Sequence, residues 1–212
     1  SSQVDEVLFV DNHSDNINLV KKEIKGSHFS YIENEANYGI AKALNQICDY
    51  ACCQGYTWVL TLDQDSVACG NIINSYNHFV EDDRIGLMTC RIIDRNFVNV
   101  EDASCETELV KTAITSGSYV RIDAWKKIGG FDERMFIDFV DHDFCTALIE
   151  NHFKILKIYA VSILHELGMS KKIKFLKNQV VFNHSAFRDY YLIRNRIYYA
   201  RKHKKAVSLF HN

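Results

Sequence analysis

Two carboxylates stand at the end of one short apolar stretch. The run VLTL at residues 59–62 leads directly into Asp63, Gln64 and Asp65. Ligands of α/β proteins collect at the carboxyl ends of buried parallel strands. The i, i+2 spacing lets both carboxylates converge on one cation if the chain turns. Oxygen ligands that leave positions open for phosphate and water suit Mg²⁺ or Mn²⁺, although a lone Asp-x-Asp also closes strands as an Asx-turn.

A second acidic group comprises Asp138, Asp141 and Asp143, which stand among aromatic residues. Asp138 and Asp141 are three residues apart, so they share one face if a helix starts here. Apolar walls raise the pKa of a carboxylate, which suits a general base. The alternative is that these carboxylates only stabilise a helix N-terminus through its dipole.

Two further segments are candidates for the same site. His165 ends an apolar run, and it either completes a metal site with Asp65 or is a satisfied core histidine. An imidazole joins carboxylates more readily on Mn²⁺ than on Mg²⁺. The segment Ser116-Gly117-Ser118 either brings backbone N–H groups close to a ligand or forms a bulge or turn.

Composition restricts the class of protein. The chain has 212 residues, of which 47% are hydrophobic, enough for one sizeable core. A net charge of -2 provides no basic field for nucleic acid. The seven cysteines include no Cys-x-x-Cys pair, as expected in a reducing compartment. Since we find no signal peptide and no apolar run of roughly 18 residues, we expect a cytoplasmic protein.

Apolar runs and amphipathic segments alternate through the first part of the chain. Strands are predicted at residues 7–10, 29–32 and up to 62, with helices from 14 or 15 to 24 and from 40 to 52. This βαβ succession implies a parallel sheet with right-handed crossovers. Further strands are expected at 85–90, 109–115, 119–122, 154–159 and 161–164, with a hairpin near 94–96. Helices are expected at 70–80, at 123–128, up to 151 and beyond 171.

The tail is basic and aromatic. Four tyrosines at 190, 191, 198 and 199 alternate with arginine and lysine between residues 188 and 205. Such a pattern suits a lipid headgroup interface. It also occurs in proteins that bind single-stranded nucleic acid, which the overall charge disfavours. The third interpretation is a helix that packs its aromatic side chains on the domain.

Taken in order, these pieces resemble a family-2 glycosyltransferase of the GT-A fold, in its rhamnosyltransferase-like branch. Seven colinear segments carry the resemblance: VDNHS (10–14), NYGIAKALN (37–45), LDQDS (62–66), TSGS (115–118), GGFDERMFIDFVDHDF (129–144), HELG (165–168) and RDYYLIRN (188–195). The resemblance implies an α/β domain over 1–170, with a mostly parallel sheet flanked by helices. A basic helical segment at 171–212 would pack on this domain. The family's opening strand has no counterpart ahead of residue 7, so we expect it to be missing.

The resemblance also implies a role for each candidate residue. Asp141 would be the general base, with Asp138 and Asp143 on the acceptor side. Asp65 and His165 would hold Mg²⁺ or Mn²⁺. The residues expected at the nucleotide-sugar are Asp11, Asn12, Asp63, Ser116 and Gly117.

With one metal site and one base, the implied reaction is inverting sugar transfer. The donor would be a dTDP- or UDP-sugar, with L-rhamnose from dTDP-rhamnose favoured. The acceptor would be a saccharide or a lipid-linked molecule of a bacterial cell-surface polysaccharide. The tail at 188–205 would contact the inner face of the membrane. Two other functions stay open: a transferase-like module that binds without turnover, and a metal-dependent nucleotidyltransferase, although the chain shows no basic, glycine-rich phosphate loop near its start.

Overall fold

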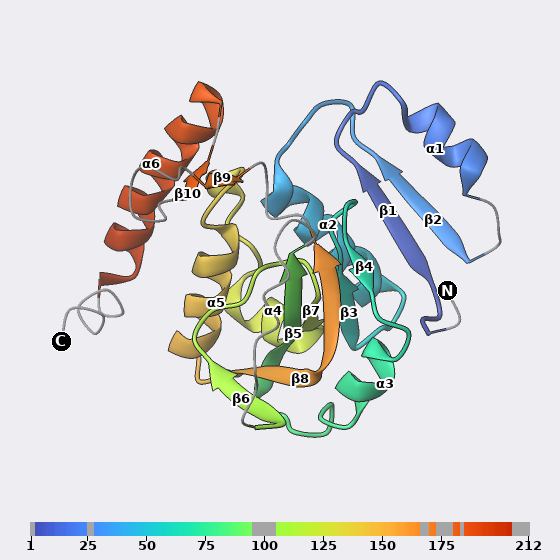
Figure 1. Cartoon of the computed structure of the whole chain (residues 1–212), viewed down its shortest axis with the longest axis vertical. Coiled ribbons are helices and arrows are strands. Elements are labelled where there is room, and N and C mark those ends of the chain that lie inside the picture. The colour runs from blue at the N-terminus through green and yellow to red at the C-terminus, as the bar shows by residue number, and fades with distance from the viewer. Residues whose placement is uncertain are drawn as a thin grey trace.

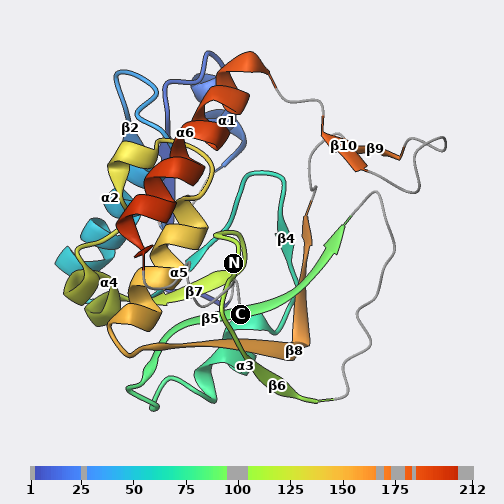
Figure 2. The same ribbon diagram turned by 90° about the vertical axis from the view of Figure 1, so that its left-hand side faces the viewer.

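A central sheet with helices on both faces forms the body of the protein (Figure 1). The computed structural model describes residues 3–24, 28–94, 105–165, 170–172, 180–182 and 185–204. The last helix, α6 (Ala186–Lys202), lies beside α5 (Val140–Glu150) in both views of the ribbon (Figures 1 and 2). None of the helices within these residues is long and apolar enough to cross a bilayer.

The first half follows the predicted alternation of strands and helices. The elements are β1 (Val7–Asp11), α1 (Ile17–Glu23), β2 (Phe29–Glu33), α2 (Ile40–Cys53) and β3 (Trp58–Thr61). Strands β1 and β2 pair in parallel across the crossover helix α1, as the βαβ pattern requires. Within the described residues, β1 and β3 each have one hydrogen-bonded neighbour and so leave one edge unpaired. A further opening strand stays a prediction.

The larger sheet has six strands in the order β3-β7-β5-β8-β4, with β6 added on β8. Its other strands are β4 (Val67–Ala68), β5 (Ile85–Asp94), β6 (Thr107–Val110), β7 (Ser118–Arg121) and β8 (Lys154–His165). The pairings make β3, β5 and β8 point one way, while β7, β4 and β6 run against them. The predicted α/β class is confirmed, and the shared direction of β3, β5 and β8 brings their carboxyl ends to one side of the sheet.

Two apolar clusters cover the two faces of the larger sheet. One joins α2, α4 (Ile122–Ile128) and α5, because Leu44, Trp125 and Phe144 all point into it. The other lies under α3 (Ile72–Asn77), where Tyr76 and Ile163 are fully buried. In α2 the buried residues recur at 41, 44, 45, 48 and 51, the spacing of one helix face. Helices therefore cover both faces of the sheet that positions the site.

Three expectations about elements need correction. The strand expected at 109–115 covers only Thr107–Val110, and residues 115–118 form a turn closed by Ser118 N–H donating to the Thr115 carbonyl. The two strands expected at 154–164 are one strand, β8, with an irregularity in its pairing to β5 after residue 158. Beyond residue 171 the chain first forms an antiparallel pair, β9 (Ser170–Lys172) and β10 (Val180–Phe182), since the adjacent β-branched valines favour a strand. Residues 95 and 96 of the expected hairpin lie outside the described residues.

Candidate active site

Three strand ends bring the predicted metal ligands together. Asp63 and Asp65 follow β3, and His165 is the last residue of β8. Strands β3 and β8 run in the same direction, so their carboxyl ends meet at one edge of the sheet. The reversed strand β7 begins at this edge, and Ser116 lies just before it. The sheet order therefore places residues from distant parts of the sequence at one position.

Asp63, Asp65 and His165 are close enough to share one cation. One ligand atom from each residue lies within 4.8 Å of the other two. Nδ1 of His165 is 3.1 Å from Oδ1 of Asp65, and its Nε2 is 4.0 Å from Oδ2 of Asp63. Two carboxylates and one imidazole form a donor set that suits Mg²⁺ or Mn²⁺. All three side chains are at least half shielded from solvent, so the residues present fit a divalent cation.

Two serines hold this cluster in shape. The Ser66 hydroxyl lies 2.7 Å from Nδ1 of His165 and 2.7 Å from the Ser116 hydroxyl. Ser116 also accepts a hydrogen bond from the backbone N–H of Asp63 at 3.2 Å. Contacts to Nδ1 leave Nε2 of His165 directed toward Asp63, as a ligand nitrogen would be. The sequence motif contains Ser66 directly after Asp65, yet its bridging role was not predicted.

The electrostatics of Asp63 favour a bound cation. Burial raises the pKa of this carboxyl group, and attraction to His165 opposes the rise. The carboxylates of Asp65 and Asp141 raise it further by repulsion. A cation among these groups would relieve both the desolvation and the repulsion. The Asp141 carboxylate thus lies near enough to Asp63 for the two charges to interact.

Gly117 sits under the site in a conformation that favours glycine. Its φ is 78°, and its backbone N–H donates to the Thr61 carbonyl at 2.8 Å. A Cβ atom here would lie 3.0 Å from Cδ1 of Ile163 and 3.1 Å from Sγ of Cys90. The Gly117 carbonyl accepts a hydrogen bond from the buried Tyr76 hydroxyl at 2.7 Å. The interpretation as a turn is therefore correct for Gly117, and the turn carries Ser116 into the cluster.

Asp141 occupies the first turn of α5 and is half-buried. Its Oδ1 accepts the backbone N–H of His142 at 2.8 Å. With Thr61, Thr115 and Ser118 it lines a small cavity at the ends of β3 and β7. The carboxylate therefore lies beside the ends of β3 and β7 and keeps one oxygen for a further partner.

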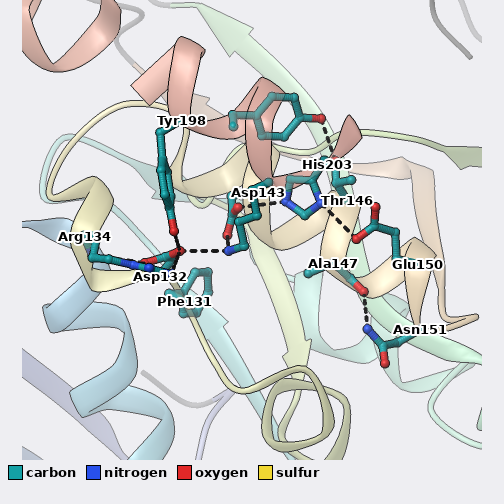
Figure 3. A network of polar contacts seen from close by, with 12 residues as sticks. Phe131, Asp132, Arg134, Asp143, Thr146, Ala147, Glu150, Asn151, Tyr198 and His203 are labelled. Carbon is teal, nitrogen blue, oxygen red and sulfur yellow. Dashed lines mark hydrogen bonds and ion pairs between the residues drawn. The ribbon is translucent and has the colours of Figure 1, made fainter. Parts of the chain in front are cut away.

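Asp138 and Asp143, which were expected on the acceptor side, both contact basic side chains near the C-terminal end of the described chain. The Asp143 side chain is buried, and its two oxygens contact Lys202 and His203 at 2.8 Å each (Figure 3). Asp138 is paired with Nη2 of Arg188 at 3.0 Å. Residues two apart on a helix point to different sides, so Asp143 faces away from the side that carries Asp141. Both carboxylates bind the last helix.

Asp11 and Asn12 form a separate polar group at the carboxyl end of β1. Burial raises the pKa of Asp11, but hydrogen bonds from Ser14 and His13 outweigh this effect and lower it. The Asn12 amide donates to the Gly39 carbonyl at 3.2 Å, and its oxygen accepts from Asn34 at 2.9 Å. The group therefore fastens the end of β1 to the loop before α2. A contact with a nucleotide stays a prediction.

Solved glycosyltransferases share this fold. A crystal structure of GalNAc-T7 with UDP, GalNAc and Mn²⁺ superimposes with a TM-score of 0.64 at 12% identity, over 76% of this chain and 38% of that one. Staphylococcus aureus TarS in complex with UDP gives 0.59 at 17% identity, over 77% and 51%. The mannosyltransferase PcManGT of Pyrobaculum calidifontis, in complex with GDP-Man and Mn²⁺, gives 0.58 at 17% identity, over 77% and 48%.

Sequence comparison agrees with the structural likeness. The chain is 26% identical over 182 residues to dTDP-rhamnosyl transferase RfbF of Shigella flexneri, which covers 78% of this chain. It spans 61% of the length of that curated relative. The model of the family described as glycosyl transferase family 2 matches residues 1–156, a stretch that contains Asp63, Asp65 and Asp141. This match covers well over half of the 212 residues, and the chain therefore belongs to glycosyl transferase family 2.

Proposed function

We propose that the protein is a metal-dependent, inverting glycosyltransferase that moves a sugar from a nucleotide-sugar to an acceptor hydroxyl. One observation carries the proposal: Asp63, Asp65 and His165 converge within 4.8 Å at the edge of the sheet where β3 and β8 end. A cation site and a separate carboxylate are the two parts that such a transfer needs. Membership of glycosyl transferase family 2 supports the same reaction.

Each site residue has a task in this reaction. A divalent cation held by Asp63, Asp65 and His165 would stabilise the negative charge of the leaving diphosphate. Asp141 accepts the proton of the acceptor hydroxyl as that oxygen attacks the sugar. Ser116 and Gly117 form the floor between the two sides, and Asp11 and Asn12 contact the nucleoside. With one base and no second carboxylate in a nucleophile's position among the described site residues, single displacement inverts the anomeric carbon.

For the donor we propose dTDP-L-rhamnose, with other dTDP- and UDP-sugars as the alternatives. The relative from Shigella flexneri is described as a dTDP-rhamnosyl transferase, and this likeness supports the choice. The structural relatives were solved with UDP or GDP-Man, so the fold alone does not select a nucleotide. The acceptor would be a saccharide or lipid-linked intermediate of a cell-surface polysaccharide.

We place this reaction at the cytoplasmic face of a membrane, and the outer face of α6 supports that placement. Tyr190, Ile193 and Ile197 are 60%, 62% and 50% exposed and lie on one side of the helix. Arg196 and Arg201 flank this stripe and are also exposed. Apolar side chains bordered by cations suit a bilayer that contains anionic lipid.

Sedimentation with vesicles tests the membrane contact. The chain should pellet with phosphatidylglycerol vesicles and stay in solution with phosphatidylcholine vesicles. Ile193→Ser with Ile197→Ser should abolish pelleting. Equal behaviour with both lipids, or pelleting that survives both substitutions, would overturn this contact.

Nucleotide binding and turnover test the reaction itself. We expect dTDP to raise the melting temperature in Mn²⁺ or Mg²⁺ but not in a chelator, because a ligand at 100 times its Kd adds about 2.7 kcal/mol of stability. Asp65→Ala should remove this dependence on metal, while Asp15→Asn, a change at an exposed carboxylate, should preserve it. Release of dTDP from dTDP-L-rhamnose then separates an enzyme from a module that only binds. A metal-dependent shift without release would contradict the catalytic proposal.

A further inference from the structure

The segment that leads into Asp141 has an unusual backbone. Phe136, Asp138 and Phe139 have φ values of 58°, 61° and 64°, although none of them is glycine. Non-glycine residues in this region cost of order 1–3 kcal/mol each and persist only where the surroundings hold them. Asp141 follows Phe139 by two residues, so the shape of this segment determines where α5 starts and where the carboxylate points.

Asn195 of α6 donates hydrogen bonds to the backbone of residues 135–138. The side chain is fully buried, and its amide nitrogen lies 2.6 Å from the Met135 carbonyl, 2.7 Å from that of Ile137 and 3.0 Å from that of Asp138. An amide has two hydrogens, so at least one must be shared among the three carbonyls. Its oxygen accepts from Nε of Arg194 at 3.1 Å, which fixes the orientation of the amide group.

Neighbouring side chains of α6 reinforce this hold. Arg188 pairs with Asp138 at 3.0 Å, and the Tyr191 ring stacks on Phe136 with centroids 5.0 Å apart. From the other side, the backbone N–H of Ile40 at the start of α2 donates to the Phe136 carbonyl at 2.7 Å. The segment is therefore fixed between two helices. Asn195 alone satisfies several of its buried carbonyls with one side chain.

We propose that Asn195 is a positioning residue for sugar transfer, acting through Asp141 without touching the substrate. Its three backbone contacts hold residues 135–138 in the conformation that presents the Asp141 carboxylate to the acceptor hydroxyl. This role rests on the proposed function of Asp141 as base. A misplacement of about 1 Å in a reacting group can cost roughly 100-fold in rate.

The test replaces the Asn195 side-chain amide, a hydrogen-bond donor, by a carboxylate of the same shape that can only accept. Asn195→Asp removes the N–H groups and sets a carboxylate oxygen against backbone carbonyls. We expect dTDP release from dTDP-L-rhamnose to fall roughly 10- to 100-fold in kcat. The metal-dependent thermal shift with dTDP should persist, and amide hydrogen exchange should rise in peptides covering residues 135–142. Asn74→Asp, the same change at an exposed position of α3, is the control and should change none of these.

Two additions keep the test decisive. Arg188→Gln removes the ion pair with Asp138 and so loosens the same segment from the surface. It should lower kcat in the same way but by a smaller factor, and it serves as the test if Asn195→Asp fails to fold. In an Asp141→Asn background, Asn195→Asp should add little further loss, because both changes act on one step. An equal factor in both backgrounds, or unchanged exchange at 135–142, would overturn the role of Asn195. Absence of turnover by the unmodified chain would instead overturn the proposed function, and the positioning role with it.

Discussion

The Asp143 carboxylate lies 2.8 Å from Nε2 of His203, in the buried contact between α5 and α6 (Figure 3). Nδ1 of His203 lies 2.9 Å from Oε2 of Glu150, so the imidazole bridges two carboxylates. Lys202 approaches the other Asp143 oxygen at 2.8 Å and also contacts Asp132 at 2.9 Å. Lys202 of α6 and His203 directly after it thus contact acidic side chains around α5, and the imidazole makes this contact sensitive to pH.

The pH dependence of stability should reveal His203. Burial lowers the pKa of its imidazole, but hydrogen bonds to Asp143 and Glu150 outweigh burial and raise it above the ordinary value. A raised pKa stabilises the fold fully below the unfolded value of about 6.5, and this contribution disappears as pH rises through the folded pKa. We expect the unmodified chain to have a larger free energy of unfolding than His203→Gln, and the difference should be largest at acidic pH. Urea titrations of both chains across this range measure the difference; a gap that widens toward alkaline pH would contradict the assignment.

Asp143→Asn should reduce stability more than it reduces activity per folded molecule. The change leaves Lys202 and His203 without their shared carboxylate. We expect a loss of roughly 3 kcal/mol, the lower end for breaking a buried ion pair, because Lys202 is partly exposed. The urea midpoint of the variant measures this loss. Asp123→Asn, at an exposed carboxylate in the first turn of α4, is the control and should shift the midpoint little. A normal midpoint with lost turnover would return Asp143 to the acceptor side.

Asp141→Asn should separate binding from catalysis. The amide keeps the shape of the side chain but cannot accept the acceptor's proton, so transfer should fall by roughly 10²–10⁴-fold. Metal-dependent binding of dTDP should be nearly intact, because the ligand set of Asp63, Asp65 and His165 is unchanged. Nucleotide release and thermal shift, measured on one preparation, check both statements. Full activity in the variant would exclude Asp141 as the base.

Gly117→Ala should be far more costly than Gly55→Ala. Both glycines have positive φ, 78° and 80°, but a Cβ at Gly55 meets nothing within 4 Å. We expect about 1 kcal/mol from backbone strain at Gly55. At Gly117, overpacking against Ile163 and Cys90 should add roughly 1–3 kcal/mol. Thermal unfolding compares the two variants. Gly117→Ala should also lower turnover through the displaced Ser116, and equal stability losses would show that crowding is not what requires glycine here.

Much of the fold could be predicted because local patterns and the sheet agree. The apolar runs at 7–10, 29–32 and 85–90 became β1, β2 and β5, and the 3.6-residue spacing in α2 gave its buried face. Prediction failed where pairing decides the structure. Val67 and Ala68 form the short strand β4 only because β8 passes beside them, and no local pattern indicates this. The turn at 115–118 likewise overrides a run that is compatible with a strand.

The Asp63, Asp65 and His165 cluster was predictable, and the contacts of the last helix were not. Asp63, Asp65 and His165 stand at the ends of recognisable strands, so one rule about sheet edges brings them together. By contrast, Asn195 contacts residues 57 to 60 positions earlier, and Asp143 meets its partners 59 and 60 positions later. Such pairs depend on how α6 packs against the domain, and the spacing of apolar residues along the sequence does not determine that packing. The expectation for Asp143 followed its place in a motif, whereas its burial followed from that docking.

The docking of α6 also affects the order in which parts of the site can form while the chain is being synthesised. The family match ends at residue 156, and by that point the chain already contains Asp63, Asp65 and Asp141. The side chain that satisfies the carbonyls of residues 135, 137 and 138 is made only at residue 195. A nascent chain on the ribosome therefore carries its cation ligands and its carboxylate before it can shape the segment between them. On the role proposed for Asn195, the segment before Asp141 takes its shape only after α6 has emerged and folded back on residues made long before.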